Sequence, residues 1–146
     1  MTAFHEVQFG SPTYHAVREL RDAVLRRPLG LARREDFGPE DGFRHFALLE
    51  GGEVVACAMG VPREPGRWQI RQMAVLPQRQ GKGLGRQLLT AAEAALFAAG
   101  ATHLYLFARE HAIGFYAGLG YIPVGERFEE IGLPHQRMEK ALRTPA

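Results

Sequence analysis

Cysteine is nearly absent from this chain: Cys57 is the single one among 146 residues. It cannot form a disulfide within the chain, so a reducing compartment is permitted. The sequence also lacks an apolar run of the length that a membrane span needs, and it shows no leader segment. We therefore expect a cytoplasmic protein without a membrane partner. Because Cys57 lies inside an apolar run, we expect a small core residue rather than a nucleophile.

Lysine is scarce as well, so arginine carries most of the positive charge. Two lysines stand against sixteen arginines, with a net charge of +2 and a pI near 9.0. The arginines are scattered and are not interleaved with aromatic residues, whereas nucleic-acid binding needs a concentrated basic footprint. We therefore expect no nucleic-acid partner. A local excess at Arg71, Arg79, Lys82 and Arg86 instead favours one anionic ligand.

Metal-ligand spacing is also missing from the sequence. The six histidines, at positions 5, 15, 45, 103, 111 and 135, are not paired with acidic residues on a helix face. The sequence therefore predicts no metal site.

The chain does have a glycine-rich segment, Gln80-Gly81-Lys82-Gly83-Leu84-Gly85, between a strand-like run and an apolar-periodic helix. Backbone N–H groups at such a helix start bind phosphate or pyrophosphate. A Walker loop needs Ser or Thr after its lysine, but Gly83 follows Lys82. A Rossmann fingerprint needs a third small residue where this chain has Arg86 or Leu88. Neither nucleotide motif is present.

The element order predicts one α/β domain over residues 1–146, large enough to bury a core without disulfides. Ser11 and Pro12 are typical of a helix start, and this helix is expected to reach Arg26. Residues 27–42 are expected to form a loop or a broken short helix. A crossover helix between two strands favours parallel pairing. Strands are expected over 3–9, 43–49, 53–59, 68–76, 102–108, 121–125 and 135–141, and helices over 84–99 and 110–119.

The spacing Gln-x-x-Gly-x-Gly (Gln80, Gly83, Gly85) resembles the acetyl-coenzyme A loop of the GNAT superfamily of N-acyltransferases. The preceding segment 73–77 is similar to the strand end and turn of that family. Residues 112–121, with Phe115-Tyr116, are similar to its second signature. The resemblance implies a mixed twisted sheet with flanking helices and two parallel strands that splay apart at the cofactor site. Segments 20–31 and 125–140 are further similar to the small bacterial ElaA/YjcF-like branch.

The resemblance implies acetyl-CoA as co-substrate and no metal. The pantetheine of acetyl-CoA would pair with the strand before the loop, and the pyrophosphate of acetyl-CoA would lie on the amides of residues 80–85. Arg109 stands where the family often has an asparagine, and it could reach a phosphate or face solvent. The residues implied to bind the cofactor are Met73, Ala74, Val75, Gln80, Gly81, Lys82, Gly83, Leu84, Gly85, Arg86, Arg109 and Tyr116.

Acetyl transfer to an amine requires a neutral amine, a stabilised oxyanion and a proton for the departing thiolate. In the resembled family, backbone N–H near Ala74 or Val75 would meet the oxyanion, and Tyr116 would face the thioester sulfur as the acid. The alternative for Tyr116 is a core aromatic. Relatives often carry a carboxylate as general base where this chain has Arg71 and Gln72. Neither of these side chains can accept a proton, so the residue that acts as the base is not identified by the resemblance. His135 is the leading candidate, a water relay is an equal alternative, and the other candidates are His45, His111, Glu110, Glu129 and Glu130.

The sequence therefore predicts an N-acyltransferase that moves an acetyl group from acetyl-CoA to a primary amine of a small molecule by direct transfer. One alternative is a coenzyme A-binding module with weak or lost catalysis. The other is an acetyltransferase acting on a protein amine, which would need an open peptide groove beside residues 27–42. A homodimer is compatible with the sequence.

Overall fold

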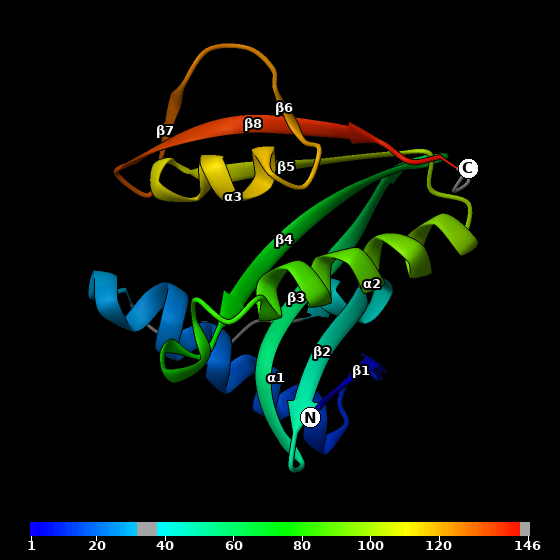
Figure 1. The fold of residues 1–146 in the computed structure, drawn as a ribbon, viewed down its shortest axis with the longest axis vertical. Coiled ribbons are helices and arrows are strands. Elements are labelled where there is room, and N and C mark those ends of the chain that lie inside the picture. Colours follow the sequence, from blue (N-terminus) through cyan, green and yellow to red (C-terminus); the bar gives the residue numbers. More distant parts are fainter. Residues whose placement is uncertain (32–37, 144–146) are drawn as a thin grey trace.

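The computed structural model describes residues 1–31 and 38–143, which form one fold around a continuous mixed sheet (Figure 1). Eight strands pair in the order β1-β2-β3-β4-β5-β8-β6, and β7 pairs with β8. The part of the expected loop 27–42 that covers 32–37 lies outside the described residues. The strands are β1 (Thr2–Val7), β2 (Arg44–Glu50), β3 (Glu53–Glu64), β4 (Arg67–Val75), β5 (His103–Arg109), β6 (Ile122–Pro123), β7 (Phe128–Glu130) and β8 (Leu133–Ala141).

Helices cover both faces of this sheet, with α1 (Pro12–Arg21) on one face and α2 (Leu84–Ala98) on the other (Figure 1). Alternate side chains of β2 and β3 face the two helices, because successive residues of a strand point to opposite faces. Phe46 and Leu48 join the cluster under α2, whereas Ala47 and Cys57 join the cluster under α1. Each face of the sheet therefore has its own apolar core.

Two sequence expectations, the cap at Ser11 and the core position of Cys57, are confirmed at this level. Ser11 caps α1, since its hydroxyl accepts a hydrogen bond from the Tyr14 backbone N–H at 3.1 Å. Cys57 is fully buried, and this burial raises the pKa of its thiol to about 12, as suits a core residue. No helix in the described residues is long and apolar enough to cross a membrane.

The helix expected to reach Arg26 changes character after Arg21. Residues Asp22–Arg26 form a π-helical turn, η1, and a short 3-10 turn, η2 (Arg27–Leu29), follows. The expected helix 110–119 is likewise shorter: a 3-10 turn, η5 (Glu110–Ala112), leads into α3 (Ile113–Ala117). Two further 3-10 segments are η3 (Gly38–Gly42) and η4 (Pro77–Arg79).

The segment 126–130, expected to separate two late strands, contains the strand β7 instead. Its register with β8 pairs Glu130 with Leu133, so Ile131 and Gly132 form a two-residue hairpin turn. Both have positive φ, 48° and 74°, which is the backbone of a type I′ turn. As a consequence β8 begins at Leu133, and His135 lies inside the strand rather than at its start.

The two parallel strands β4 and β5 meet at one end and then diverge (Figure 1). They pair over Arg67–Gln69 and His103–Tyr105, and in the described part of the chain their pairing ends there. On its other edge β4 carries a bulge: Cys57 pairs with Ala74 and Met59 with Arg71, so two residues of β4 oppose one of β3. Gln72 in this bulge has φ 54°, an uncommon value for a residue other than glycine. The expected splayed strands are therefore present.

A buried ion pair fixes α1 to the chain that precedes β2. The Arg21 guanidinium donates to both carboxylate oxygens of Glu40, at 3.0 and 3.1 Å, and the Tyr14 hydroxyl donates to Glu40 Oε1 at 2.7 Å. Burial alone would raise the pKa of Glu40, but the hydrogen bonds from Arg21 and Tyr14 outweigh it and hold that pKa below its ordinary value.

We expect Glu40→Gln to destabilise the fold by about 2–5 kcal/mol, because it removes the charge that two buried donors bond. Urea unfolding of the purified variant measures this loss. The control is Glu110→Gln, which breaks the exposed Arg127–Glu110 pair and should cost less than about 1 kcal/mol. Equal, small losses in the two variants would contradict an anchoring role for the buried pair.

Candidate active site

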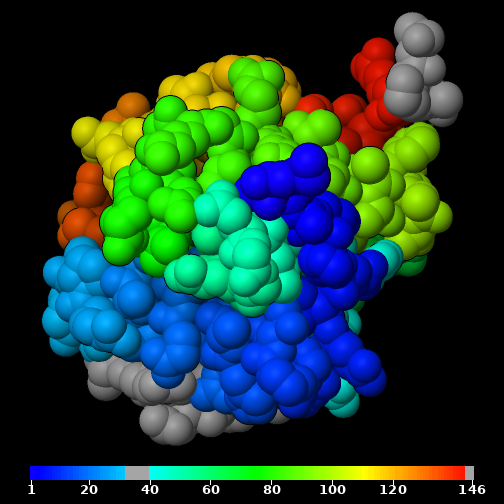
Figure 2. Space-filling model, turned by 60° about the horizontal axis from the view of Figure 1, so that its bottom comes forward, coloured from blue at the N-terminus to red at the C-terminus, as the bar shows by residue number. Residues whose placement is uncertain are grey.

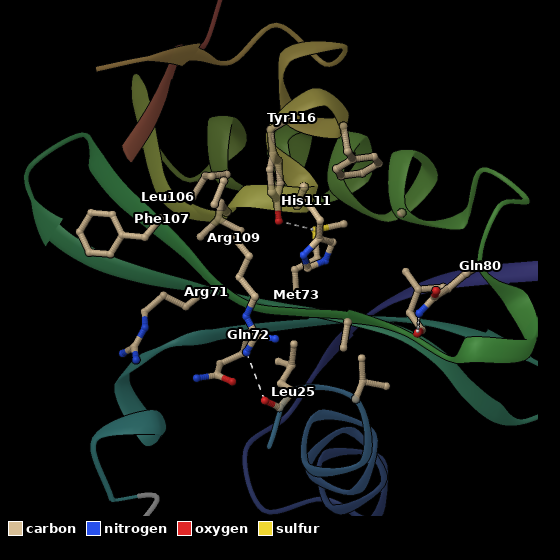
Figure 3. Close-up of a pocket in the computed structure, with 18 of the residues that line it drawn as sticks. Leu25, Arg71, Gln72, Met73, Gln80, Leu106, Phe107, Arg109, His111 and Tyr116 are labelled. Carbon is tan, nitrogen blue, oxygen red and sulfur yellow. Dashed lines mark hydrogen bonds between the residues drawn. The ribbon is translucent and has the colours of Figure 1, made fainter. Parts of the chain in front are cut away.

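A cleft of about 910 Å³ opens where β4 and β5 diverge (Figure 3). It begins at the glycine-rich loop before α2, passes the β4 edge and Tyr116, and ends between η1 and the β7–β8 turn. Ligands in α/β sheets bind beyond the carboxyl ends of parallel strands, and this cleft has that position.

The glycine-rich loop forms one end of the cleft and lies at the molecular surface, between the β2–β3 turn and α3 (Figure 2). Gly81 and Gly83 have φ of 77° and 79°, which favours glycine at both positions. Gly83 is the N-cap of α2, so the N–H groups of the first turn point out of the helix without intrahelical partners. The Gln80 side chain donates to the Val75 carbonyl at 3.0 Å and ties the loop to β4.

The two signature segments of the sequence contact each other at Gly85. A Cβ at this position would lie 3.0 Å from Phe115 Cζ and 3.4 Å from Met73 Cε. Close packing, rather than backbone conformation, therefore favours glycine at this position. The contact seats α3 against the start of α2 and against β4.

The free edge of β4 lines the middle of the cleft. The Leu76 N–H donates to the Val55 carbonyl of β3 at 2.8 Å. Because backbone groups alternate between the two edges of a strand, those of Val75 face the cleft and those of Ala74 face β3. The bond from Gln80 to the Val75 carbonyl agrees with this alternation.

Tyr116 points from α3 towards β4, with its hydroxyl 3.5 Å from Met73 Sδ (Figure 3). Desolvation raises the pKa of this phenol to about 12, so it is protonated throughout the physiological range. The structure therefore presents a protonated hydroxyl in the middle of the cleft.

Arg109, at the end of β5, extends across the cleft towards η1 (Figure 3). Its Nη2 donates to the Leu25 carbonyl at 3.1 Å. In the close-up the side chain lies in the middle of the view, below Tyr116, and points towards Leu25, whereas Gln80 lies at one end of the cleft. Arg109 thus lies apart from the glycine-rich loop.

The candidate bases separate into residues that line the cleft and residues that do not. His135 lies in β8 opposite Arg109, and its Nδ1 is 2.8 Å from the Leu133 carbonyl. A carbonyl oxygen accepts, so Nδ1 carries the proton and Nε2, 3.8 Å from Glu130 Oε2, is left unprotonated in the neutral ring. His111 and Glu130 also line the cleft.

The other candidates lie outside the cleft lining. His45 is buried, and its Nε2 is 2.9 Å from the Glu40 carbonyl. Glu110 pairs with Arg127 at the surface, and Glu129 lies in β7 opposite Pro134. Among the described residues no group of three His, Cys, Asp or Glu side chains is placed to hold a metal ion.

Sequence reasoning missed several parts of the cleft wall. The bulge at Gln72 depends on pairing with β3, and Leu25 and Phe107 reach the cleft through the η1 turn and the alternation of β5. The period-2 pattern of β5 could have identified Phe107 as a residue of the face opposite α2.

A comparison with known families matches residues 11–121 to the acetyltransferase (GNAT) family. The chain therefore belongs to this family. Two relatives in Bacillus subtilis (strain 168), both named uncharacterized N-acetyltransferases, are similar over most of their length. YitI is 29% identical over 136 residues, covering 86% of this chain and 90% of the relative. YjcF is 31% identical over 130 residues, covering 83% and 87%.

Solved structures agree with this assignment. Escherichia coli ElaA is 26% identical, with a TM-score of 0.81 over 96% of this chain and 99% of that chain. An aminoglycoside 6'-N-acetyltransferase complexed with coenzyme A has the same fold, with a TM-score of 0.79, 18% identity and 99% coverage of both chains. The resemblance to GNAT proteins and to their small ElaA/YjcF-like branch is confirmed.

We expect Gly83→Asp to weaken coenzyme A binding by well over tenfold, more than roughly 1.4 kcal/mol. The substitution places a negative charge where a phosphate would approach the start of α2. Gly83→Asn is the matched control, since Asn and Asp both tolerate positive φ and differ in charge. Calorimetric titration of the folded variants measures both affinities. Parental affinity in the Asp variant would rule out the loop as the phosphate site.

Proposed function

We propose that this protein transfers an acetyl group from acetyl-CoA directly to the primary amine of a small molecule. One observation carries the proposal: a single cleft joins the glycine-rich loop, the free edge of β4 and the Tyr116 hydroxyl. These are an anion site, a backbone edge and an acid, in the order in which coenzyme A presents pyrophosphate, pantetheine amides and thioester. Family membership supports the same chemistry.

Cofactor binding would use mainly backbone groups. The N–H groups of the α2 start favour the pyrophosphate, with Lys82 and the exposed Arg86 close by to balance its charge. The pantetheine amides would pair with the part of β4 that follows Gln69, where β5 no longer pairs with it. Met73, Ala74 and Val75 are the residues of that segment. Ligand binding would thus satisfy backbone groups that a regular sheet satisfies internally.

The transfer forms a C–N bond and breaks the C–S bond of the thioester through a tetrahedral intermediate. The Val75 N–H is the better donor for its oxyanion, because the Ala74 groups face β3. The collapsing intermediate releases coenzyme A as a thiolate, which takes the proton of Tyr116. A thiolate in the same desolvated space has its own pKa raised by the same cause, so the two groups stay close in basicity.

The amine must lose a proton before or during attack. His135 supports this role best among the candidates, because Nδ1 is held by the Leu133 carbonyl and leaves Nε2 as the proton acceptor. A water relay without a dedicated base, or with His111, is the alternative. The cytoplasmic location and a homodimer remain predictions from the sequence.

One assay distinguishes this proposal from the two alternatives, which are a coenzyme A-binding module and an acetyltransferase acting on a protein amine. Incubation with acetyl-CoA and a broad panel of amines, read out as thiol release, should show turnover with small primary amines. Thiol release with peptides alone would indicate a protein amine as acceptor. Coenzyme A binding without turnover on either panel would indicate a binding module.

We expect Tyr116→Phe to lower turnover by about 10²–10⁴-fold while coenzyme A affinity is retained. The variant keeps the ring that packs beside Phe115 and removes the hydroxyl. Tyr105→Phe is the control, since Tyr105 lies outside the cleft lining. Turnover at the parental rate would make Tyr116 a packing residue, with water protonating the thiolate.

We expect His135→Gln to lower turnover and to remove an acidic limb from the pH profile of kcat/KM for the acceptor. Coenzyme A binding should be unchanged, because His135 lies at the end of the cleft remote from the loop. His103→Gln, at the start of β5, serves as the control. Survival of the limb in His135→Gln would assign the proton transfer to another group or to water.

A further inference from the structure

Arg109 lies in the part of the cleft where an acceptor would bind. It extends from β5 to the Leu25 carbonyl, in the middle of the close-up and apart from Gln80 of the glycine-rich loop (Figure 3). Its register partner in β8 is His135, the proposed base. Arg109 therefore lies at the strand position opposite the proposed base and apart from the loop proposed to bind the phosphates.

The contacts of Arg109 leave much of its hydrogen-bonding capacity unused. A guanidinium has five N–H donors, and the structure accounts for one of them with the Leu25 carbonyl. Among the described residues no carboxylate forms an ion pair with Arg109. The side chain is half-buried in the cleft wall, so a ligand group can reach the remaining donors.

The surroundings of Arg109 suit an acceptor with two different groups. Its guanidinium lines the cleft and favours an acceptor that carries an anionic group. Phe107 and Ile131 line the same cleft and are 37% and 52% exposed, which offers an apolar surface to a methylene chain.

We propose that the acceptor is an amine that also carries a carboxylate, and that Arg109 binds this carboxylate. The planar fork of arginine matches a carboxylate in a bidentate geometry. This assignment rests on the proposed transferase function. It replaces the expectation that Arg109 contacts a phosphate of the cofactor. The alternative is a purely mechanical role, in which Arg109 ties β5 to η1 and treats all acceptors alike.

The test compares acceptors that differ in charge and share the same chain. β-Alanine, γ-aminobutyrate, δ-aminovalerate and ε-aminocaproate are each paired with their primary amide, and kcat/KM is measured by thiol release. We expect the best carboxylate to exceed its amide by roughly ten- to hundredfold, the usual size of a charge-assisted hydrogen bond. No preference for carboxylates at any chain length would overturn the proposal.

Variants assign the preference to one side chain. Arg109→Gln should reduce the carboxylate-to-amide ratio to near unity, and Arg109→Lys should restore part of it. Arg127→Gln removes a charge at a nearby position outside the cleft lining and should leave the ratio unchanged. An equal loss for carboxylate and amide in Arg109→Gln would indicate the mechanical role, and the proposal would fail.

Two binding measurements keep this proposal separate from the transferase function. Calorimetry with coenzyme A should give the same affinity for the parent and for Arg109→Gln, and a loss there would return Arg109 to the cofactor. N-Acetyl-δ-aminovalerate and its amide are then titrated into the protein loaded with coenzyme A. Arg109-dependent preference for the carboxylate supports the site even if every amine fails to turn over, and its absence overturns the site.

Discussion

The structure depends on the separation of two parallel strands. β4 and β5 pair at their first residues, and the bulge at Gln72 then bends β4 as β5 diverges from it. Burying unpaired backbone groups costs free energy, so a strand edge opened in this way is stable when solvent or a ligand satisfies it. The cleft, the backbone edge that lines it and the position of Tyr116 above that edge all follow from this separation.

Packing on both sides keeps the strands apart. On one side, α3 is seated against α2 and β4 through Phe115 and Gly85. On the other, α1 is anchored by the buried Arg21–Glu40 pair, and the η1 turn that continues it meets Arg109 from β5. The shape of the cleft is therefore set by contacts between segments far apart in the sequence.

Local sequence patterns predicted those structural features that a few neighbouring residues determine. The glycine-rich loop, the Ser11 cap and the alternating apolar strands were identified because each is fixed within a few residues. The hairpin of β7 and β8 was missed because Ile131 occupies a positive-φ turn position where Asn, Asp or Gly is usual. The bulge at Gln72 and the path of Arg109 depend on partners in other strands and in η1, so no window of sequence contains them.

The packing contact between Gly85 and Phe115 makes the residue choices in the two signature segments depend on each other. A side chain at position 85 would push against Phe115, and Tyr116 is the next residue along the same short helix. A methyl group added at position 85 of the glycine-rich loop would therefore displace the Phe115 ring and, with it, the neighbouring Tyr116, which is the proposed acid. A larger residue at position 85 therefore requires either a smaller residue at position 115 or a shift of α3.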